Sequence, residues 1–269
     1  MRPMRLNISH MTRYDFAEPV PYGLQQVRLT PMTRAHQTVL RWTLRIEGGS
    51  EEARFNDQHM NIVDLVRIDP ERTSISLVCE GEVETREENG IVGRHDGTAP
   101  LWYFRRETPL TKAGTKLRAL IRDFDAMDGQ DVTAFHDLAR FISGEVAYRT
   151  DTTLATTTAE DALASGQGVC QDHAHIFIAA ARLLGYPARY VSGYLFMDDR
   201  VEQEAGHAWA EVHIDGLGWV GFDVSNGISP DERYVKIATG LDYSEAAPVA
   251  GVTFGGGGQS MLVSLQVQQ

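Results

Sequence analysis

Cys170 has the surroundings of a reactive thiol. It follows the glycine-rich segment GQGV and begins a run of apolar residues at helical spacing, which places the thiol in the first turn of a predicted helix over residues 170–184. The unpaired N–H groups and the positive dipole end of such a turn favour the nucleophilic thiolate and can bind an oxyanion. A lone cysteine in a helix is more often a small packed side chain, however, so other residues must show whether Cys170 is reactive.

A hairpin predicted over residues 207–224 supplies a histidine and a carboxylate. Its apolar residues have even numbers in both arms: Ala208, Ala210, Val212, Ile214, Val220, Phe222 and Val224. Because both arms must turn this face to one core, the register is fixed and places Trp209 opposite Asp223. His207 is then diagonal to Asp223, about 7–8 Å away and within reach of the two side chains.

Cys170, His207 and Asp223 are therefore predicted to act as nucleophile, base and the group that orients the base. The hairpin brings the last two together, but the residue types do not say that Cys170 meets His207. The alternatives are a hydrogen-bonded histidine at the edge of the core and an aspartate that caps a turn in DVSNG.

Residues 1–108 are predicted to form an antiparallel β domain, with the strand order left open. Two of its segments alternate strictly, with apolar faces made by Leu40, Trp42, Leu44 and Ile46 and by Ile75, Leu77 and Cys79. Since Cys79 lies on the apolar face of a strand, we interpret it as a packed side chain rather than a reactive one.

Residues 109–269 are predicted to form an α+β domain that carries the site. Apolar residues fall at helical spacing over 117–124 and 135–142, and the helix that begins at Cys170 is stopped by Gly185 and Pro187. Strands are predicted over 188–196, 207–214 and 219–224, with a final strand over 261–267. The four glycines before it open no helix and precede no lysine, so they indicate a loop rather than a phosphate site.

The composition excludes some classes of function. The net charge of the 269-residue chain is -12 and no cluster of Lys and Arg forms a stripe, so we expect no nucleic-acid partner. No segment approaches the roughly 20 apolar residues that span a bilayer, and the first residues lack a secretory signal, so we expect no membrane partner. The two cysteines fit a reducing compartment, and we predict a cytoplasmic protein of unknown oligomeric state.

Polar and aromatic residues near the predicted site need not take part in the chemistry. Asp172 is expected to cap the helix, and His173 and His175 point to different helix faces, so we predict no metal site and no cofactor. Three aromatic residues can line a substrate groove or belong to the core: Tyr190, Tyr194 and Trp209. No residue is assigned as second oxyanion donor.

Two segments, GQGVCQDHAHIFIAAARLLGYPARYVSGYL and GHAWAEVHIDGLGWVGFD, closely resemble the core of bacterial transglutaminase-like proteins, some of which are described as cysteine proteases. The opening MRLNISHMTRYDFAEPVPYGLQQVRLTPMT resembles the β-rich N-terminal domain that accompanies this core. The resemblance implies a papain-related core in which Cys170 attacks an amide carbonyl, His207 transfers the proton and Asp223 stabilises the imidazolium.

Two departures from the family pattern concern specificity more than chemistry. Relatives often continue after the aspartate as Asp-Pro-Thr-Asn, whereas this chain has DVSN. Leu241 stands where the family usually carries an arginine, which can alter a salt bridge or an acceptor-side contact.

The resulting functional hypothesis is acyl transfer from a peptide or glutaminyl amide through a thioester on the cysteine. We expect hydrolysis, as a protease or deamidase, because water is always available as acceptor. Protein-glutamine transamidation is the alternative, since an amine acceptor follows the same chemistry. A non-catalytic transglutaminase-like binding module is a second alternative, against which the intact Cys170, His207 and Asp223 speak, and a metal-dependent hydrolase ranks last.

Overall fold

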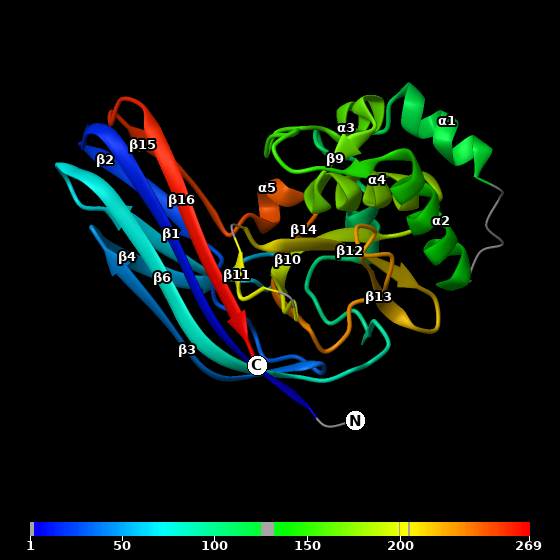
Figure 1. The fold of residues 1–269 in the computed structure, drawn as a ribbon, viewed down its shortest axis with the longest axis horizontal. Coiled ribbons are helices and arrows are strands. Elements are labelled where there is room, and N and C mark those ends of the chain that lie inside the picture. The colour runs from blue at the N-terminus through cyan, green and yellow to red at the C-terminus, as the bar shows by residue number, and fades with distance from the viewer. Residues whose placement is uncertain (1–2, 125–131, 199, 204) are drawn as a thin grey trace.

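The protein has two structural units that lie side by side in a computed structural model, which describes residues 3–124, 132–198, 200–203 and 205–269 (Figure 1). One is a β-sandwich, and the other is a sheet covered by helices. Their order along the chain agrees with the predicted fold class, an N-terminal β region followed by an α+β core.

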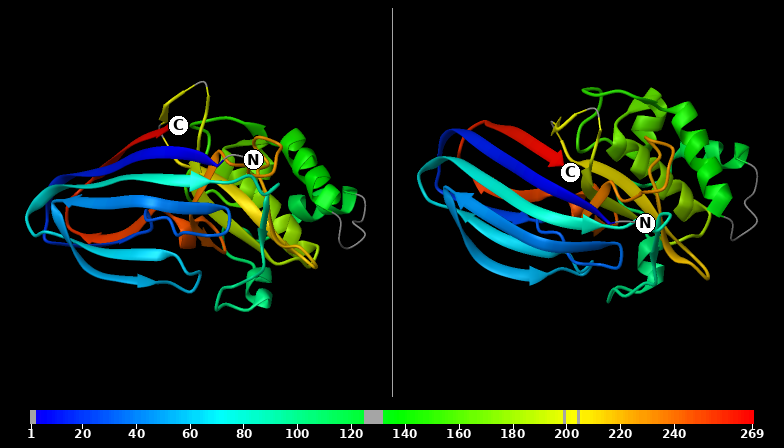
Figure 2. Two further views of the ribbon diagram at one scale, coloured as in Figure 1. Left: turned by 90° about the horizontal axis from the view of Figure 1, so that it is seen from below. Right: turned by 60° about the horizontal axis from the view of Figure 1, so that its bottom comes forward.

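The sandwich consists of two antiparallel sheets that Figure 2 shows in layers. The first has the order β11-β16-β1-β6-β3 and the second β15-β2-β5-β4. The strands are β1 (Met4–Val20), β2 (Tyr22–Val27), β3 (Gln37–Glu47), β4 (Gly49–Asn56), β5 (Ile62–Ile68), β6 (Arg72–Thr85), β11 (Glu202–Gln203), β15 (Val249–Phe254) and β16 (Gln259–Gln268). Alternating side chains of both sheets fill the space between them, and Cys79 is fully buried there, as predicted.

Strand β3 departs from the predicted alternation at one residue. Trp42, Leu44 and Ile46 pack against the sandwich core, whereas Leu40 is 44% exposed. The register with β6 shifts between Val39 and Arg41, so Leu40 lies at a β-bulge that turns it out of the apolar face.

The second unit is a mixed layer structure around a sheet of order β14-β10-β12-β13-β7. Its strands are β7 (Ile91–Gly93), β10 (Ala188–Leu195), β12 (His207–Ile214), β13 (Gly218–Phe222) and β14 (Tyr234–Gly240), with a parallel pair β8 (Ala147–Tyr148) and β9 (Gln167–Gly168). Its helices are the 3-10 helix η1 (Leu101–Arg105), α1 (Thr115–Asp123), α2 (Val132–Glu145), α3 (Ala159–Ser165), α4 (Cys170–Leu183) and α5 (Tyr243–Ala246). Helix α4 is buried between the sheet and the other helices (Figure 1).

Strand pairing divides the chain differently from the predicted boundary at residue 108. The last two strands, which we grouped with residues 109–269, pair with the sandwich: β16 with β1, and β15 with β2. Conversely, two elements that we grouped with residues 1–108 belong to the second unit. Strand β7 pairs with β13, and Phe104 of η1 packs against Trp219 of the core. Alternation shows that a segment is a strand, but it does not show which neighbour completes its hydrogen bonds.

Within the described residues, no helix is long and apolar enough to cross a membrane.

Candidate active site

The thiol of Cys170 lies at the first residue of α4, as predicted. A glycine is needed two residues before it, since a Cβ at Gly168 would meet the Asp172 side chain at 2.7 Å. Asp172 folds back there, and its Oδ2 accepts hydrogen bonds from the Val169 N–H (2.8 Å) and the Thr153 hydroxyl (2.7 Å). Asp172 therefore holds the turn that presents the thiol, the supporting role expected of it.

The hairpin of β12 and β13 has the predicted register. Ala210 pairs with Phe222 and Val212 with Val220, and all four pack into the main core against α4. Continued by one pair, this register sets Trp209 opposite Asp223.

His207 and Asp223 meet directly at the end of this hairpin. Nε2 of His207 is 2.6 Å from Oδ2 of Asp223, which leaves Nδ1 for Cys170, the second hydrogen-bond partner of the imidazole. Burial alone would lower the pKa of His207, but the hydrogen bonds and charges of Asp223 and Cys170 reverse this and raise it to about 10. The structure thus brings the three predicted residues together and favours the imidazolium.

Asp223 accepts three further hydrogen bonds, one of which is the turn cap within DVSNG that the sequence offered as an alternative role. The Tyr234 hydroxyl donates to Oδ2 (2.8 Å), as does the Asn226 side-chain amide (2.7 Å), and the Asn226 N–H donates to Oδ1 (3.1 Å). Burial would raise the pKa of Asp223, but the hydrogen bond and charge of His207 lower it, together with the hydrogen bonds from the side chains of Asn226 and Tyr234. Asn226 is the last residue of the DVSN segment, so its closeness to Asp223 could be read from the sequence. Tyr234 lies on a different strand, β14, and no local pattern predicts that this strand comes close to Asp223.

The histidines of α4 are neutral structural groups. His173 bonds the Val146 carbonyl through Nε2 (2.9 Å) and the Ser225 hydroxyl through Nδ1 (2.9 Å), so Ser225 of the DVSN departure ties this turn to the helix. His175 accepts a hydrogen bond from the Tyr243 N–H, and burial lowers its pKa to about 4. Across the part of the chain that the structure describes, no three His, Cys, Asp or Glu side chains gather as metal ligands.

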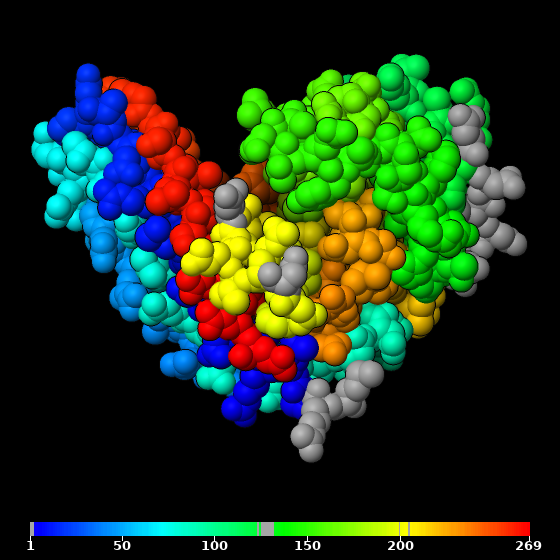
Figure 3. Space-filling view, viewed as in Figure 1, coloured from blue at the N-terminus to red at the C-terminus, as the bar shows by residue number. Residues whose placement is uncertain are grey.

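A groove opens beside the thiol and the imidazole, between the sandwich and the core. Its cavity is about 230 Å³, and Figure 3 shows the hollow between strand β16, in red, and the green segment that precedes α4. Tyr190 and Tyr194, proposed from the sequence as groove residues, line it. The opposite wall comes from β1 and β16, which the sequence did not connect to the site.

Two other residues weighed from the sequence lie outside the groove lining. Leu241 is buried in an apolar cluster with Phe104 and Trp219, where its backbone carbonyl accepts a hydrogen bond from Arg182 (2.7 Å). Trp209 stacks on the imidazole of His207, with ring centroids 6.3 Å apart.

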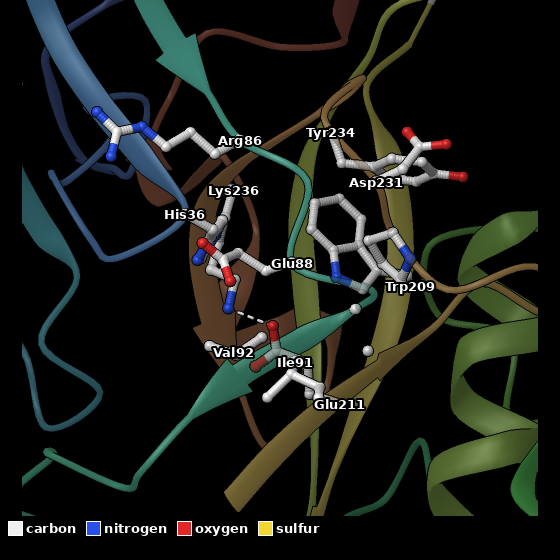
Figure 4. Close-up of a pocket in the computed structure, with 13 residues that line it drawn as sticks. His36, Arg86, Glu88, Ile91, Val92, Trp209, Glu211, Asp231, Tyr234 and Lys236 are labelled. Atoms are coloured by element: carbon white, nitrogen blue, oxygen red, sulfur yellow. Dashed lines mark ion pairs between the residues drawn. The ribbon is translucent and has the colours of Figure 1, made fainter. Parts of the chain in front are cut away.

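A small cavity of about 30 Å³ is lined by Trp209, Glu211 and Lys236 (Figure 4). Glu211 forms ion pairs there with Lys236 and with Arg189, whose Nε is 2.7 Å from Oε2 of Glu211. All three side chains are nearly or fully buried. Burial would raise the pKa of Glu211, but the two cations hold it near 2. Trp209 therefore separates two polar clusters of different character.

Comparison with known proteins agrees with this architecture. The chain is 26% identical to an uncharacterised protein from Mycobacterium leprae over 98% of both chains, and 25% identical to one from Mycobacterium bovis over 93% of this chain and 88% of that one. A solved structure described as a putative cysteine protease from Cytophaga hutchinsonii superposes with a TM-score of 0.79 at 22% identity, over 100% of this chain and 91% of that one. At this identity the superposition shows that the two chains share a fold.

Two family descriptions match separate parts of the chain. Residues 6–84 match the bacterial transglutaminase-like N-terminal region, which covers most of the sandwich. Residues 118–224 match the core of the transglutaminase-like superfamily, and this range includes Cys170, His207 and Asp223. The chain therefore belongs to the bacterial transglutaminase-like proteins, with both the family's N-terminal region and its core.

Proposed function

We propose that the protein is a cysteine-nucleophile hydrolase that cleaves peptide or glutaminyl amides through a thioester on Cys170. The observation that carries this proposal is the position of the His207 imidazole, which is bonded through Nε2 to Asp223 at 2.6 Å and lines the same groove as the thiol at the start of α4, whose hydrogen bond and charge raise the His207 pKa. The transglutaminase-like core supports a cysteine-based enzyme in general.

The first half of the reaction forms the acyl-enzyme. The Cys170 thiolate attacks the amide carbonyl carbon, and the C=O electron pair moves to oxygen. The resulting oxyanion is stabilised by the unpaired N–H groups of the first turn of α4. The imidazolium of His207 then gives its proton to the leaving nitrogen, the C–N bond breaks, and a thioester remains.

The second half regenerates the thiolate. Neutral His207 takes a proton from water as the oxygen attacks the thioester, and the tetrahedral intermediate expels the Cys170 sulfur with the C–S electron pair. The products are a carboxylic acid and the thiolate–imidazolium pair. Asp223, bonded to Nε2, keeps Nδ1 directed at the sulfur throughout both steps.

The test is a search for the acyl-enzyme and its products by intact-protein and peptide mass spectrometry. Peptides that contain glutamine are incubated with wild type and with Cys170→Ala, in water and with an added primary amine. We expect cleaved or deamidated peptide from the wild type and at least about a 10⁴-fold slower reaction from the variant. Amine adducts as the main product would replace hydrolysis by transamidation, and an equally active Cys170→Ala would refute a cysteine nucleophile.

A further inference from the structure

The groove beside Cys170 is built from two facing walls. On the core side it is lined by Tyr190 and Tyr194, and on the sandwich side by alternate residues of β1 and β16. Thr12 pairs with Val263 and Tyr14 with Met261, so these four side chains share one face of the sheet. The next pair along that face, His10 and Leu265, is buried.

The groove is closed at one end and open at the other. Leu265 is fully buried, Val263 is partly buried, and Met261 is 59% exposed, so access to the wall increases toward Met261. Figure 3 shows the open end as the hollow between the red strand and the green helical region. A peptide that enters from this end has its side chains between two walls on the way to the thiol.

The chemical character of the walls differs from that of the whole chain. The protein is 23% charged with a net charge of -12, yet the groove residues that the structure describes are apolar, aromatic or neutral polar, with two histidines. His207 belongs to the catalytic pair. His10 is hydrogen bonded to the Tyr194 hydroxyl (2.7 Å) and the Thr12 hydroxyl (3.0 Å), and burial lowers its pKa to about 4, so it is neutral at neutral pH.

We infer that this groove selects substrates with an uncharged, apolar or aromatic side chain next to the scissile amide, and that the β1–β16 face of the sandwich is the specificity wall. The inference rests on the proposed function of Cys170 and names its substrate class. An apolar side chain in the groove removes its own surface and that of the wall from water. An ionised side chain loses hydration there and, apart from the Cys170–His207 pair itself, meets no charged side chain on the described walls.

Met261 and Leu262 provide a matched pair of positions for the test. They are neighbours on β16 with nearly equal exposure, 59% and 56%, so an aspartate is tolerated equally by the fold at either place. Met261 lines the groove, whereas Leu262 pairs with Arg13 and lies on the opposite face of the sheet. Met261→Asp therefore brings a negative charge to the groove, and Leu262→Asp brings the same charge to the outer face.

The experiment measures labelling rates of Cys170 with peptidyl acyloxymethyl ketones that carry Leu, Phe, Asp or Lys next to the reactive carbonyl. Each rate is divided by the rate with iodoacetamide, which is too small to use the walls. We expect the wild type to prefer the Leu and Phe probes over the Asp and Lys probes by at least about tenfold. In Met261→Asp the preference for Leu over Lys should fall about tenfold, and in Leu262→Asp it should stay as in the wild type.

Two outcomes overturn the inference without touching the proposed function. In the first, the four probes label the wild type equally, or a charged probe labels it faster, although His207→Ala lowers the rate at which iodoacetamide labels Cys170. The other is the same response from Met261→Asp and Leu262→Asp. If instead iodoacetamide itself labels Cys170 no faster than Cys79, the proposed function fails and the inference fails with it.

Discussion

Strand β12 carries two buried polar clusters on one face, four residues apart, and they differ in what reaches them. At its start, His207 joins Asp223 and Cys170 beside an open groove. Farther along, Glu211 joins Arg189 and Lys236 beside a cavity of only about 30 Å³. Both clusters hold groups with strongly shifted pKa values, since burial and close opposite charges act on each.

The comparison shows that a shifted pKa alone does not locate an active site. Glu211 is held by ion pairs with Arg189 and Lys236 next to Trp209, where there is room for little more than water. The other cluster has a thiol at a helix start, a carboxylate bonded to the imidazole and a groove of about 230 Å³ beside them, as the proposed function requires. We therefore expect changes at the first cluster to affect rate, and changes at the second to affect stability.

Asp223→Asn is expected to have the largest effect on rate, about 10⁴-fold on kcat/KM. The amide removes the Asp223 charge, one of the two groups that raise the His207 pKa, while the burial that lowers it remains, so the His207 pKa falls and the imidazolium stabilises the thiolate less. The fold should persist, because Tyr234 and Asn226 can still donate to the remaining oxygen.

Peptidase kinetics and a thermal unfolding curve measured on the same preparation of Asp223→Asn check this prediction. Asp231→Asn, which breaks a partly exposed pair with Arg233, is the control and should keep the wild-type rate. Wild-type kinetics for Asp223→Asn would mean that the carboxylate does not orient the imidazole.

Glu211→Gln is expected to lower the free energy of unfolding by about 3–5 kcal/mol, because it leaves the buried Arg189 guanidinium without a counter-charge and removes the carboxylate that helps to hold up the pKa of buried Lys236. The folded fraction of the variant should retain a kcat close to that of the wild type. Denaturant titration measures the change in stability. Glu80→Gln removes the same charge from an exposed pair with Arg45, and should change the stability by less than about 1 kcal/mol.

A Glu211→Gln protein that is stable but inactive would erase the distinction between the clusters. It would assign Glu211 to the chemistry of His207 rather than to the fold.

Tyr234→Phe is expected to have a smaller effect, about tenfold on kcat/KM, because it removes one of several hydrogen bonds to Asp223. That hydrogen bond helps to lower the pKa of Asp223, so its loss raises this pKa. A carboxylate with a lowered folded-state pKa contributes stability that is lost as the pH falls through that pKa.

The acid limb of both activity and stability should therefore move to higher pH in Tyr234→Phe. A pH series of kcat/KM and of the unfolding midpoint measures this shift, with Tyr22→Phe on the exposed surface of β2 as control. An unmoved acid limb would show that the hydroxyl does not act through Asp223.

The predictable part of this site follows from local patterns. Even-numbered apolar residues in both arms fixed the β12–β13 register, and with it the contact of His207 and Asp223. The glycine before Cys170 and the helical spacing after it placed the thiol at a helix start.

The rest depends on long-range pairing that local patterns do not encode. Tyr234 reaches Asp223 because β14 lies next to β10, and Met261 lines the groove because β16 pairs with β1 from the opposite end of the chain. Nothing in the alternation of a strand specifies its partner, so the specificity wall and the division into units appear only in the folded structure.

The alkylation rate of Cys170 by iodoacetamide against pH, in wild type, His207→Ala and His213→Ala, tests whether the thiol and the imidazole form an activated pair. Cys79 is the internal control, because burial raises its pKa to about 12. His213 lies on the same strand and contacts Trp219 instead of the thiol. We predict that at pH 7 Cys170 reacts at least about 100-fold faster than Cys79 in wild type and in His213→Ala. In His207→Ala, Cys170 should react at least about tenfold more slowly than Cys170 of the wild type. Equal rates at the two cysteines, or a Cys170 rate that does not change when His207 is lost, would contradict an activated pair of Cys170 and His207.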